Sequence, residues 1–92
     1  MWYVYILRCK DNSFYTGSTS DLSRRLTEHN AAKGGDYTSN RRPVEVVYKE
    51  PFQDRSSAQT REAQIKRWAK KKKAALVSGD KTLLMQLSKS HD

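Results

Sequence analysis

Five side chains of this sequence have types that phosphodiester hydrolysis can use, and four of them lie close together near the start of the chain. Tyr5 and Tyr15 lie ten positions apart near the start of the chain, Arg25 and His29 follow four residues apart, and Glu62 lies further along. Hydrolysis of a phosphodiester needs an activated water, neutralised charge on the phosphate and a stabilised leaving oxygen. The planar fork of an arginine suits phosphate oxygens better than a lysine does. The five residues therefore indicate a phosphodiester-cutting site.

Each of these residues also has an ordinary structural explanation. Tyrosines in a hairpin are commonly half-buried sheet residues, and an arginine that follows Arg24 commonly belongs to a solvated helix face. A lone histidine on a helix is more often a surface residue. Glu62 could pair with Lys66 one helical turn later, as an exposed ion pair. The combination of residues, rather than any one of them, favours catalysis.

The composition fits one small domain with an anionic partner. The chain has 92 residues, a formal net charge of +8 and 36% hydrophobic residues. That length supports a single core, and the charge favours phosphate-rich partners or anionic membrane surfaces. No apolar run is long enough to span a bilayer and no signal peptide is present, so we expect a cytoplasmic protein with no membrane partner. The single cysteine, Cys9, excludes an internal disulfide, and we expect it inside a strand.

The two tyrosines belong to a predicted β-hairpin. Residues 2–9 and 14–18 are rich in aromatic and β-branched side chains, with turn-forming residues 10–13 between them. Successive side chains of a strand point to opposite faces, so the loop length decides whether Tyr5 and Tyr15 share a face. An odd loop or a bulge brings them together, and we predict one of these.

A helix that carries Arg25 and His29 should follow the hairpin. Residues 19–21 offer N-cap oxygens, so we expect the helix to begin near Leu22 and to end at Gly34-Gly35. Arg25 and His29 then lie one turn apart on the same side.

The remaining segments predict a three-stranded antiparallel sheet flanked by helices, an α+β fold with a single domain over residues 1–92. Residues 37–43 should form a loop. Residues 44–52 alternate as a third strand would, and we expect the strand to end at Pro51. A last short helix is expected over residues 81–88.

A second long helix should open at Ser56, where Gln59 completes a capping box. The apolar stripe of this helix should consist of positions 58, 62, 65 and 69, which are Ala58, Glu62, Ile65 and Ala69. A glutamate on such a stripe is unexpected.

Five short segments together carry a family resemblance. They are Tyr3-Val4-Tyr5-Ile6-Leu7, Tyr15-Thr16-Gly17-Ser18, Asp21-Leu22-Ser23-Arg24-Arg25-Leu26, Thr38-Ser39-Asn40-Arg41-Arg42-Pro43 and Arg61-Glu62-Ala63. They resemble the signatures, helices and loop of the GIY-YIG nucleases, and in particular of their small stand-alone bacterial members. Tyr3 stands in place of the first signature glycine and Thr16 in place of the second isoleucine. The resemblance covers about residues 3–73, with residues 74–92 as a helical extension.

The resemblance implies an endonuclease that cuts one nucleic-acid strand with a single divalent ion, Mg²⁺ or Mn²⁺. Glu62 would hold the ion and Arg25 would contact the phosphate. Tyr5, with its pKa lowered by the ion or by nearby cations, is the candidate general base, and Tyr15 and His29 would position groups or relay protons.

Gly17 should have a structural role, because a glycine allows close backbone approach under the start of the helix. Basic residues should form the track for the nucleic-acid backbone. Because no element reads base sequence, we expect structure-selective or weakly selective binding. We further expect DNA rather than RNA as the partner, a role in repair or recombination, and room for a protein partner in targeting. Two alternatives are a non-catalytic nucleic-acid-binding module with this fold and an interaction protein with an acidic partner. The track residues are Arg24, Arg41, Arg42, Lys66, Arg67, Lys70, Lys71, Lys72 and Lys73.

Overall fold

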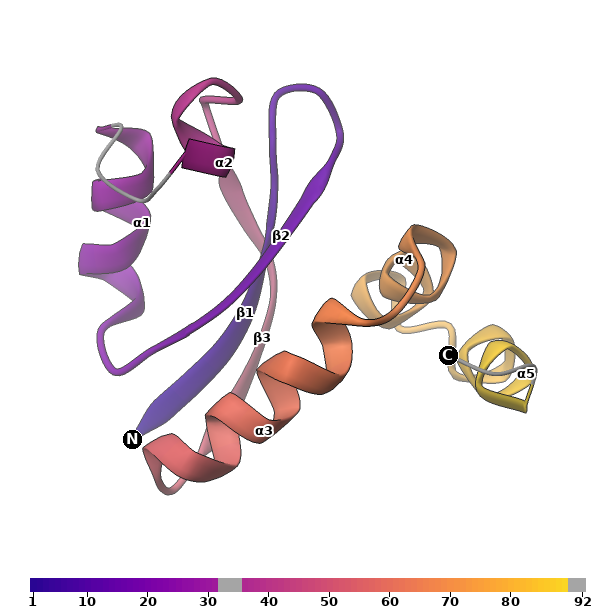
Figure 1. The fold of residues 1–92 in the computed structure, drawn as a ribbon. Helices are drawn as coiled ribbons and strands as arrows, with labels where there is room; N and C mark the ends of the chain where they lie inside the picture. Colours follow the sequence, from indigo (N-terminus) through magenta and orange to yellow (C-terminus); the bar gives the residue numbers. More distant parts are fainter. Residues whose placement is uncertain (32–35, 90–92) are drawn as a thin grey trace.

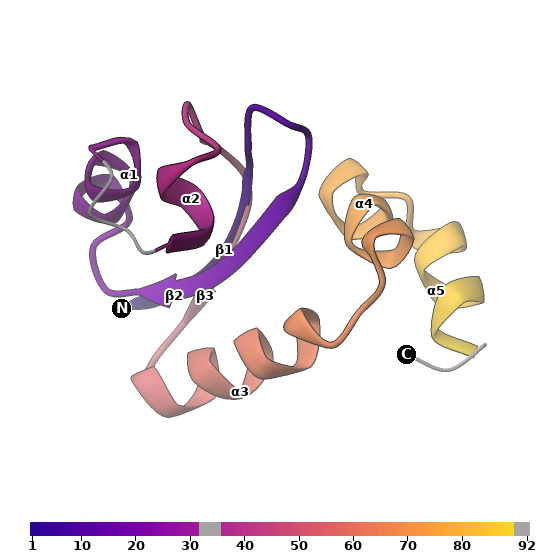
Figure 2. The ribbon, with the colours of Figure 1, turned by 45° about the horizontal axis from the view of Figure 1, so that its top comes forward.

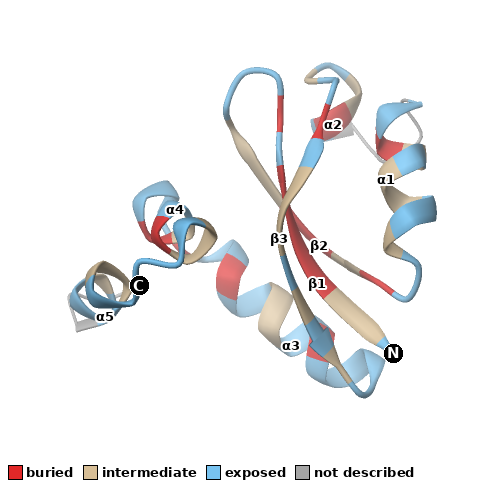
Figure 3. Cartoon of the chain, turned by 180° about the vertical axis from the view of Figure 1, so that it is seen from behind, coloured by how far each residue is buried: buried red, intermediate tan, exposed pale blue. Residues whose placement is uncertain are grey.

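A three-stranded antiparallel sheet with helices on both faces forms the body of the molecule (Figure 1). The computed structural model describes residues 1–31 and 36–89. Strand β1 (Trp2–Arg8) lies at the centre of the sheet, between β2 (Phe14–Thr19) and β3 (Glu45–Phe52). Four consecutive residues of β1 are buried, as expected for a central strand covered on both faces (Figure 3). The predicted α+β class is confirmed.

The hairpin between β1 and β2 has the register that the tyrosines require. Tyr5 pairs with Gly17, and Tyr15 therefore lies on the same face as Tyr5. The Cys9 amide donates to the Ser13 carbonyl at 2.9 Å, which leaves an odd, three-residue turn. The prediction of an odd loop is confirmed. Cys9 is buried as predicted, but it lies one residue beyond β1 rather than inside the strand.

Helix α1 (Leu22–Asn30) starts where the sequence predicts. The Asp21 carboxylate accepts a hydrogen bond from the Arg24 amide at 3.0 Å and so caps the helix. The expected end at Gly34-Gly35 lies outside the described residues, and the helix itself ends at Asn30.

The segment between α1 and β3 differs from the predicted loop over residues 37–43. Its first part forms a short helix, α2 (Asp36–Ser39), which packs on α1. Strand β3 continues through Pro51 to Phe52, one residue beyond the predicted end. Proline is tolerated there because β3 is an edge strand.

Helix α3 (Arg55–Lys66) begins earlier than predicted, and its cap is Asp54. The Asp54 carboxylate accepts a hydrogen bond from the Ser57 amide at 2.7 Å, so the predicted capping box at Ser56 is wrong. An aspartate at the N-cap satisfies the same free amides that the box was expected to satisfy.

The apolar stripe of α3 is shorter than predicted. Ala58 and Ile65 are buried against Val4 and Ile6 on one face of the sheet. The helix ends at Lys66, so Ala69 is exposed and lies outside the stripe, which corrects that prediction. Trp68 takes the buried position instead, at 7% exposure.

Two short helices follow, beside the sheet (Figures 1 and 2). Helix α4 (Lys70–Ser78) begins with four lysines and has no side-chain cap, and it ends at Gly79 with a φ of 74°. Helix α5 (Lys81–Lys89) packs mainly on α4. Leu84 of α5 reaches the core around Ile65. Within the described residues, no helix is long and apolar enough to cross a membrane.

Candidate active site

Three buried side chains form a hydrogen-bonded chain between β1, α1 and α2. The Tyr5 hydroxyl lies 3.1 Å from His29 Nε2, and His29 Nδ1 lies 2.9 Å from Thr38 Oγ1. The exposed fractions of the three residues are 1%, 0% and 1%. Tyr5 and His29, two of the predicted site residues, are therefore in direct contact, and Thr38 extends the chain.

The protein environment holds Tyr5 and His29 in their neutral forms. Burial raises the pKa of Tyr5 to about 12, although a hydrogen bond from Arg25 acts in the opposite direction. The side chains present thus raise the pKa of Tyr5, where we expected nearby cations to lower it. Burial and the positive charge of Arg25 lower the pKa of His29. A neutral phenol therefore faces a neutral imidazole at physiological pH.

Tyr15 contributes its ring to the site through packing. Its ring centroid lies 5.0 Å from that of His29 and 6.4 Å from that of Tyr5. On its other side it meets Tyr37 of α2 at 5.9 Å. Tyr15 is half-buried, whereas the three residues of the hydrogen-bonded chain are buried. Its ring therefore packs against one side of the buried chain.

Gly17 makes room for the Tyr5 ring. A Cβ atom at Gly17 would lie 2.5 Å from the Tyr5 hydroxyl oxygen and 2.7 Å from Tyr5 Cζ. We expected Gly17 to permit a close backbone approach under the start of α1, but the close approach is that of the paired tyrosine. The hydroxyl of Tyr5 consequently lies directly over the edge strand β2.

Arg25 comes from the same helix face as His29, one turn earlier. Its guanidinium bonds Glu28 Oε1 at 3.1 Å and interacts with Tyr5, and 29% of its side chain is exposed. The predicted alignment of Arg25 with His29 is thus present, and the Arg25 side chain is partly exposed.

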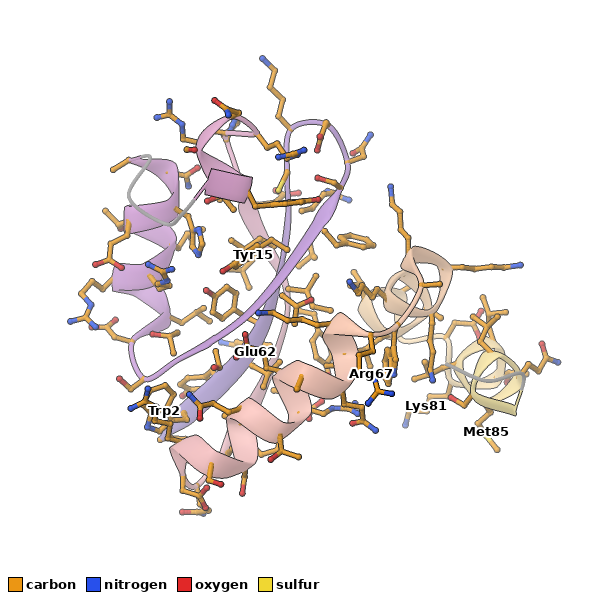
Figure 4. The ribbon with its side chains drawn as sticks, viewed as in Figure 1. Trp2, Tyr15, Glu62, Arg67, Lys81 and Met85 are labelled. Atoms are coloured by element: carbon orange, nitrogen blue, oxygen red, sulfur yellow. The ribbon has the colours of Figure 1, made fainter. Side chains whose placement is uncertain are left out.

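Glu62 reaches the same edge of β2 from the opposite face of the sheet. Ser18 Oγ donates a hydrogen bond to Glu62 Oε1 at 2.5 Å, and Lys66 Nζ lies 2.7 Å from Glu62 Oε2. Glu62 projects from α3 toward the sheet (Figure 4). Its negative charge acts on Tyr5 and raises the pKa of that phenol. The glutamate on the apolar stripe is explained by this position, because it points along β2 rather than into the core. The pair with Lys66 that the sequence allowed is also formed.

The donor set fits a hard divalent cation held by a single carboxylate. Among residues 1–31 and 36–89, no three His, Cys, Asp or Glu side chains cluster as a metal cage. Mg²⁺ and Mn²⁺ bind oxygen ligands and keep several waters when one carboxylate holds them. Glu62, with 18% of its side chain exposed and the Ser18 hydroxyl beside it, offers such a position.

The predicted basic track is only partly available for binding. Arg24, Arg67, Lys70 and Lys71 are exposed, and Lys66 is half-exposed but paired with Glu62. Lys73 is half-buried, and burial lowers its pKa. Lys72 is buried at 4% exposure, with its ammonium 4.1 Å from the centroid of the Trp68 ring, so its assignment to the track is wrong. A cation over an indole ring stabilises the fold rather than a ligand.

Arg41 and Arg42 hold the segment before β3 in place. Arg41 bonds Asp11 at 3.1 Å and stacks on the Tyr37 ring at 4.2 Å. Arg42 bonds the carbonyls of Ser39 and Asn30 at 3.0 and 3.2 Å. These contacts give both arginines a structural role that the sequence did not indicate.

Sequence reasoning missed three residues of the site. Ser18, Tyr37 and Thr38 contact Glu62, Tyr15 and His29 respectively. Ser18 and Thr38 lie within segments that resemble family motifs, which was the available signal. Tyr37 had none, because its contact depends on the unpredicted helix α2.

Comparison with known proteins gives a consistent result. The family model described as the GIY-YIG catalytic domain matches residues 1–75. A UPF0213 protein of Staphylococcus haemolyticus is 48% identical over 75 residues, which cover 82% of this chain and 92% of that protein. A UPF0213 protein of Desulfotalea psychrophila is 51% identical over 77 residues, 83% of this chain and 70% of that protein.

Two solution NMR structures have the same fold. A UPF0213 protein from Bacillus halodurans has a TM-score of 0.55 at 43% identity and covers 85% of this chain and 84% of its own. A protein from E. faecalis has a TM-score of 0.58 at 43% identity, with 84% and 82% covered. Because the family model covers most of the chain and relatives of about the same length are identical to it at close to half of the aligned positions, the chain belongs to the GIY-YIG domain family.

Proposed function

We propose that this protein is a divalent-metal-dependent endonuclease that hydrolyses phosphodiester bonds in DNA. The observation that carries the proposal is the convergence on one edge of β2. Tyr5 and Arg25 reach this edge from the α1 side of the sheet and Glu62 reaches it from the α3 side. A phosphate placed along the edge would have a donor fork on one side and a carboxylate on the other.

The neutral chain of Tyr5 and His29 suits proton transfer from the attacking water. As the water gives its proton to the Tyr5 oxygen, Tyr5 passes its own proton to His29 Nε2, and the resulting hydroxide attacks phosphorus. Tyr5 is only 1% exposed, so a neighbouring side chain must move before water reaches it. Arg25, which bonds Tyr5, is the group that a phosphate would draw away.

Glu62 would hold the metal ion, together with waters. An ion bound there supplies positive charge that stabilises the leaving oxygen. Ser18 orients the carboxylate, and Lys66 occupies the second oxygen of Glu62 until the ion replaces it.

The exposed lysines at the start of α4 extend this site along β2. The Lys70 ammonium lies 5.7 Å from the Phe14 ring at the start of β2, four residues from Ser18. Four strand residues span roughly 13 Å, or about four nucleotides of a B-form strand. Because we identify no base-reading element among residues 1–31 and 36–89, the proposed preference is for DNA structure, as in repair or recombination intermediates.

The test is cleavage of labelled single-stranded, nicked, flapped and branched DNA with Mg²⁺ or Mn²⁺. We expect the parent to cut, and Arg25→Ala and Glu62→Ala to lose at least about a hundredfold in rate. Arg8→Ala and Glu45→Ala remove one arginine and one glutamate from an exposed ion pair outside the site, and both should cut normally. Equal cutting by all five proteins would contradict the assignment.

A non-catalytic nucleic-acid-binding module is the second candidate. It is favoured by the ion pair of Glu62 with Lys66 and by the burial of Tyr5, since both groups are engaged without substrate. This alternative predicts salt-dependent DNA binding by the parent and by Glu62→Ala, with no metal-dependent cutting by either. An interaction protein with an acidic partner predicts no DNA binding at all.

A further inference from the structure

We propose that Thr38 is a positioning residue that holds His29 in the tautomer protonated on Nδ1. The tautomer leaves Nε2 free to take the proton of Tyr5. Only this catalytic use of the tautomer rests on the proposed function. The hydrogen bonds themselves are a property of the folded protein, and they exist without substrate or metal.

The burial of the chain forces a definite hydrogen-bond pattern. A buried neutral imidazole has one donor nitrogen and one acceptor nitrogen, and each needs a partner because no water replaces it. His29 has 0% exposure, and its two described partners are the hydroxyls of Tyr5 and Thr38. Both hydroxyls can donate or accept, so the pattern must be decided by their other contacts.

Arg25 decides the pattern. The Arg25 guanidinium interacts with Tyr5, and because a guanidinium only donates hydrogen bonds, the phenol oxygen can meet it only as an acceptor. The phenol proton then needs an acceptor of its own, and His29 Nε2 is the one within hydrogen-bond distance among the described residues. Nε2 must therefore carry the lone pair. The remaining ring proton lies on Nδ1 and is donated to Thr38 Oγ1.

The fold places Thr38 firmly for this role. Thr38 lies in α2, which packs on α1, and its carbonyl accepts a hydrogen bond from the Arg41 amide at 3.0 Å. Arg41 is itself held by Asp11 and by the Tyr37 ring. The hydroxyl of Thr38 is thus fixed relative to His29 by the segment that leads into β3.

The experiment reads the tautomer directly. Nitrogen-15 NMR distinguishes a protonated from an unprotonated ring nitrogen, and the background variant His91→Gln leaves His29 as the one histidine. In this background we expect a protonated Nδ1 and an unprotonated Nε2 at neutral pH. A protonated Nε2 would overturn the proposal, whatever the protein does to DNA.

Three variants then isolate the hydroxyl. Thr38→Val cannot accept the Nδ1 proton, so the tautomer should shift toward Nε2–H, whereas Thr38→Ser keeps the hydroxyl and should keep the tautomer. Thr16→Val is the matched control, because Thr16 is also buried but its hydroxyl has no described partner. An unchanged tautomer in a folded Thr38→Val would also overturn the proposal. If Thr38→Val does not fold, the tautomers of the parent and of Thr38→Ser decide.

Cleavage kinetics separate this inference from the proposed function. If the parent cuts DNA, Thr38→Val should lower kcat at least about tenfold with little change in KM, and Thr38→Ser should restore it. A shifted tautomer with an unchanged kcat would refute the positioning role. If the parent does not cut, the proposed function fails while the NMR result still decides the tautomer.

Discussion

Gly17 and Tyr5 face each other across the β1–β2 ladder, and the tyrosine ring occupies the space that a side chain at the glycine would need. The ring reaches His29 only because that space is empty. The glycine of the second signature and the tyrosine of the first are therefore two halves of one steric arrangement.

Gly17→Ala should damage both stability and catalysis. The added methyl would lie 2.5 Å from the Tyr5 hydroxyl, so the ring must shift, and we expect a loss of about 1–3 kcal/mol in unfolding free energy. Activity should fall by about a hundredfold, because a shift near 1 Å misaligns the hydroxyl. Denaturant unfolding and cleavage rates measure the two effects. In a Tyr5→Ala background the same change should cost much less stability, and an equal cost would show that the clash is not with Tyr5.

Lys71 and Lys72 should respond oppositely to removal. Lys71 is exposed, so Lys71→Ala should reduce the slope of log affinity for DNA against log salt by about 0.9 if it contacts one phosphate, with little effect on stability. Lys72→Ala should leave that slope unchanged and should destabilise the fold, because it removes the cation from the Trp68 ring. Salt titrations of DNA binding and thermal unfolding make the comparison, and a slope lowered by Lys72→Ala would contradict the buried assignment.

Lys66 should compete with a metal ion for Glu62. Its ammonium lies 2.7 Å from one carboxylate oxygen, so Lys66→Ala should tighten Mn²⁺ binding about two- to fivefold, as expected for the loss of one exposed ion pair. Calorimetry or the electron-spin signal of Mn²⁺ measures this without substrate. Lys71→Ala removes the same charge without touching Glu62, and an equal gain there would mean that the effect is only long-range.

Stability should decline on mild acidification because of His29. Burial and Arg25 lower its pKa below the ordinary 6.5, so the unfolded chain binds a proton more readily than the folded protein does. Unfolding free energy should therefore fall as pH drops from about 6.5 to the lower folded-state pKa, with a slope of at most about 1.4 kcal/mol per pH unit, and level off below it.

Urea unfolding at stepped pH in the His91→Gln background measures this slope. Asp11 and Asp54 also have lowered pKa values, but they titrate below their ordinary 3.8, in a separate pH range. His29→Asn should abolish the slope that begins as the pH falls through about 6.5, because that slope reports the proton bound by this imidazole. A slope that persists in this variant would assign it to another group.

The sequence was most informative where short-range rules apply. The parity of the hairpin and the N-cap before Leu22 depend on neighbouring residues, and both are present in the structure.

The sequence was least informative where a long-range contact overrides a local pattern. A run of four lysines predicts a solvated surface, but the Trp68 ring attracts one of them into the fold. Because α3 ends at Lys66, Ala69 lies beyond the helix and outside its apolar stripe, and Trp68 is the buried residue there instead. The role of Thr38 depends on the short helix α2, whose sequence lacks a periodic apolar pattern.

The first turn of α4 has a further consequence. Helix N-termini carry partial positive charge, and this one bears four lysines, no acidic residue and no side-chain cap. Its local charges oppose its own formation, and packing alone holds it. A polyanion bound at this turn would reduce the repulsion between the lysines and accept hydrogen bonds from the free amides. Binding should therefore stabilise α4 and raise the melting temperature of the protein.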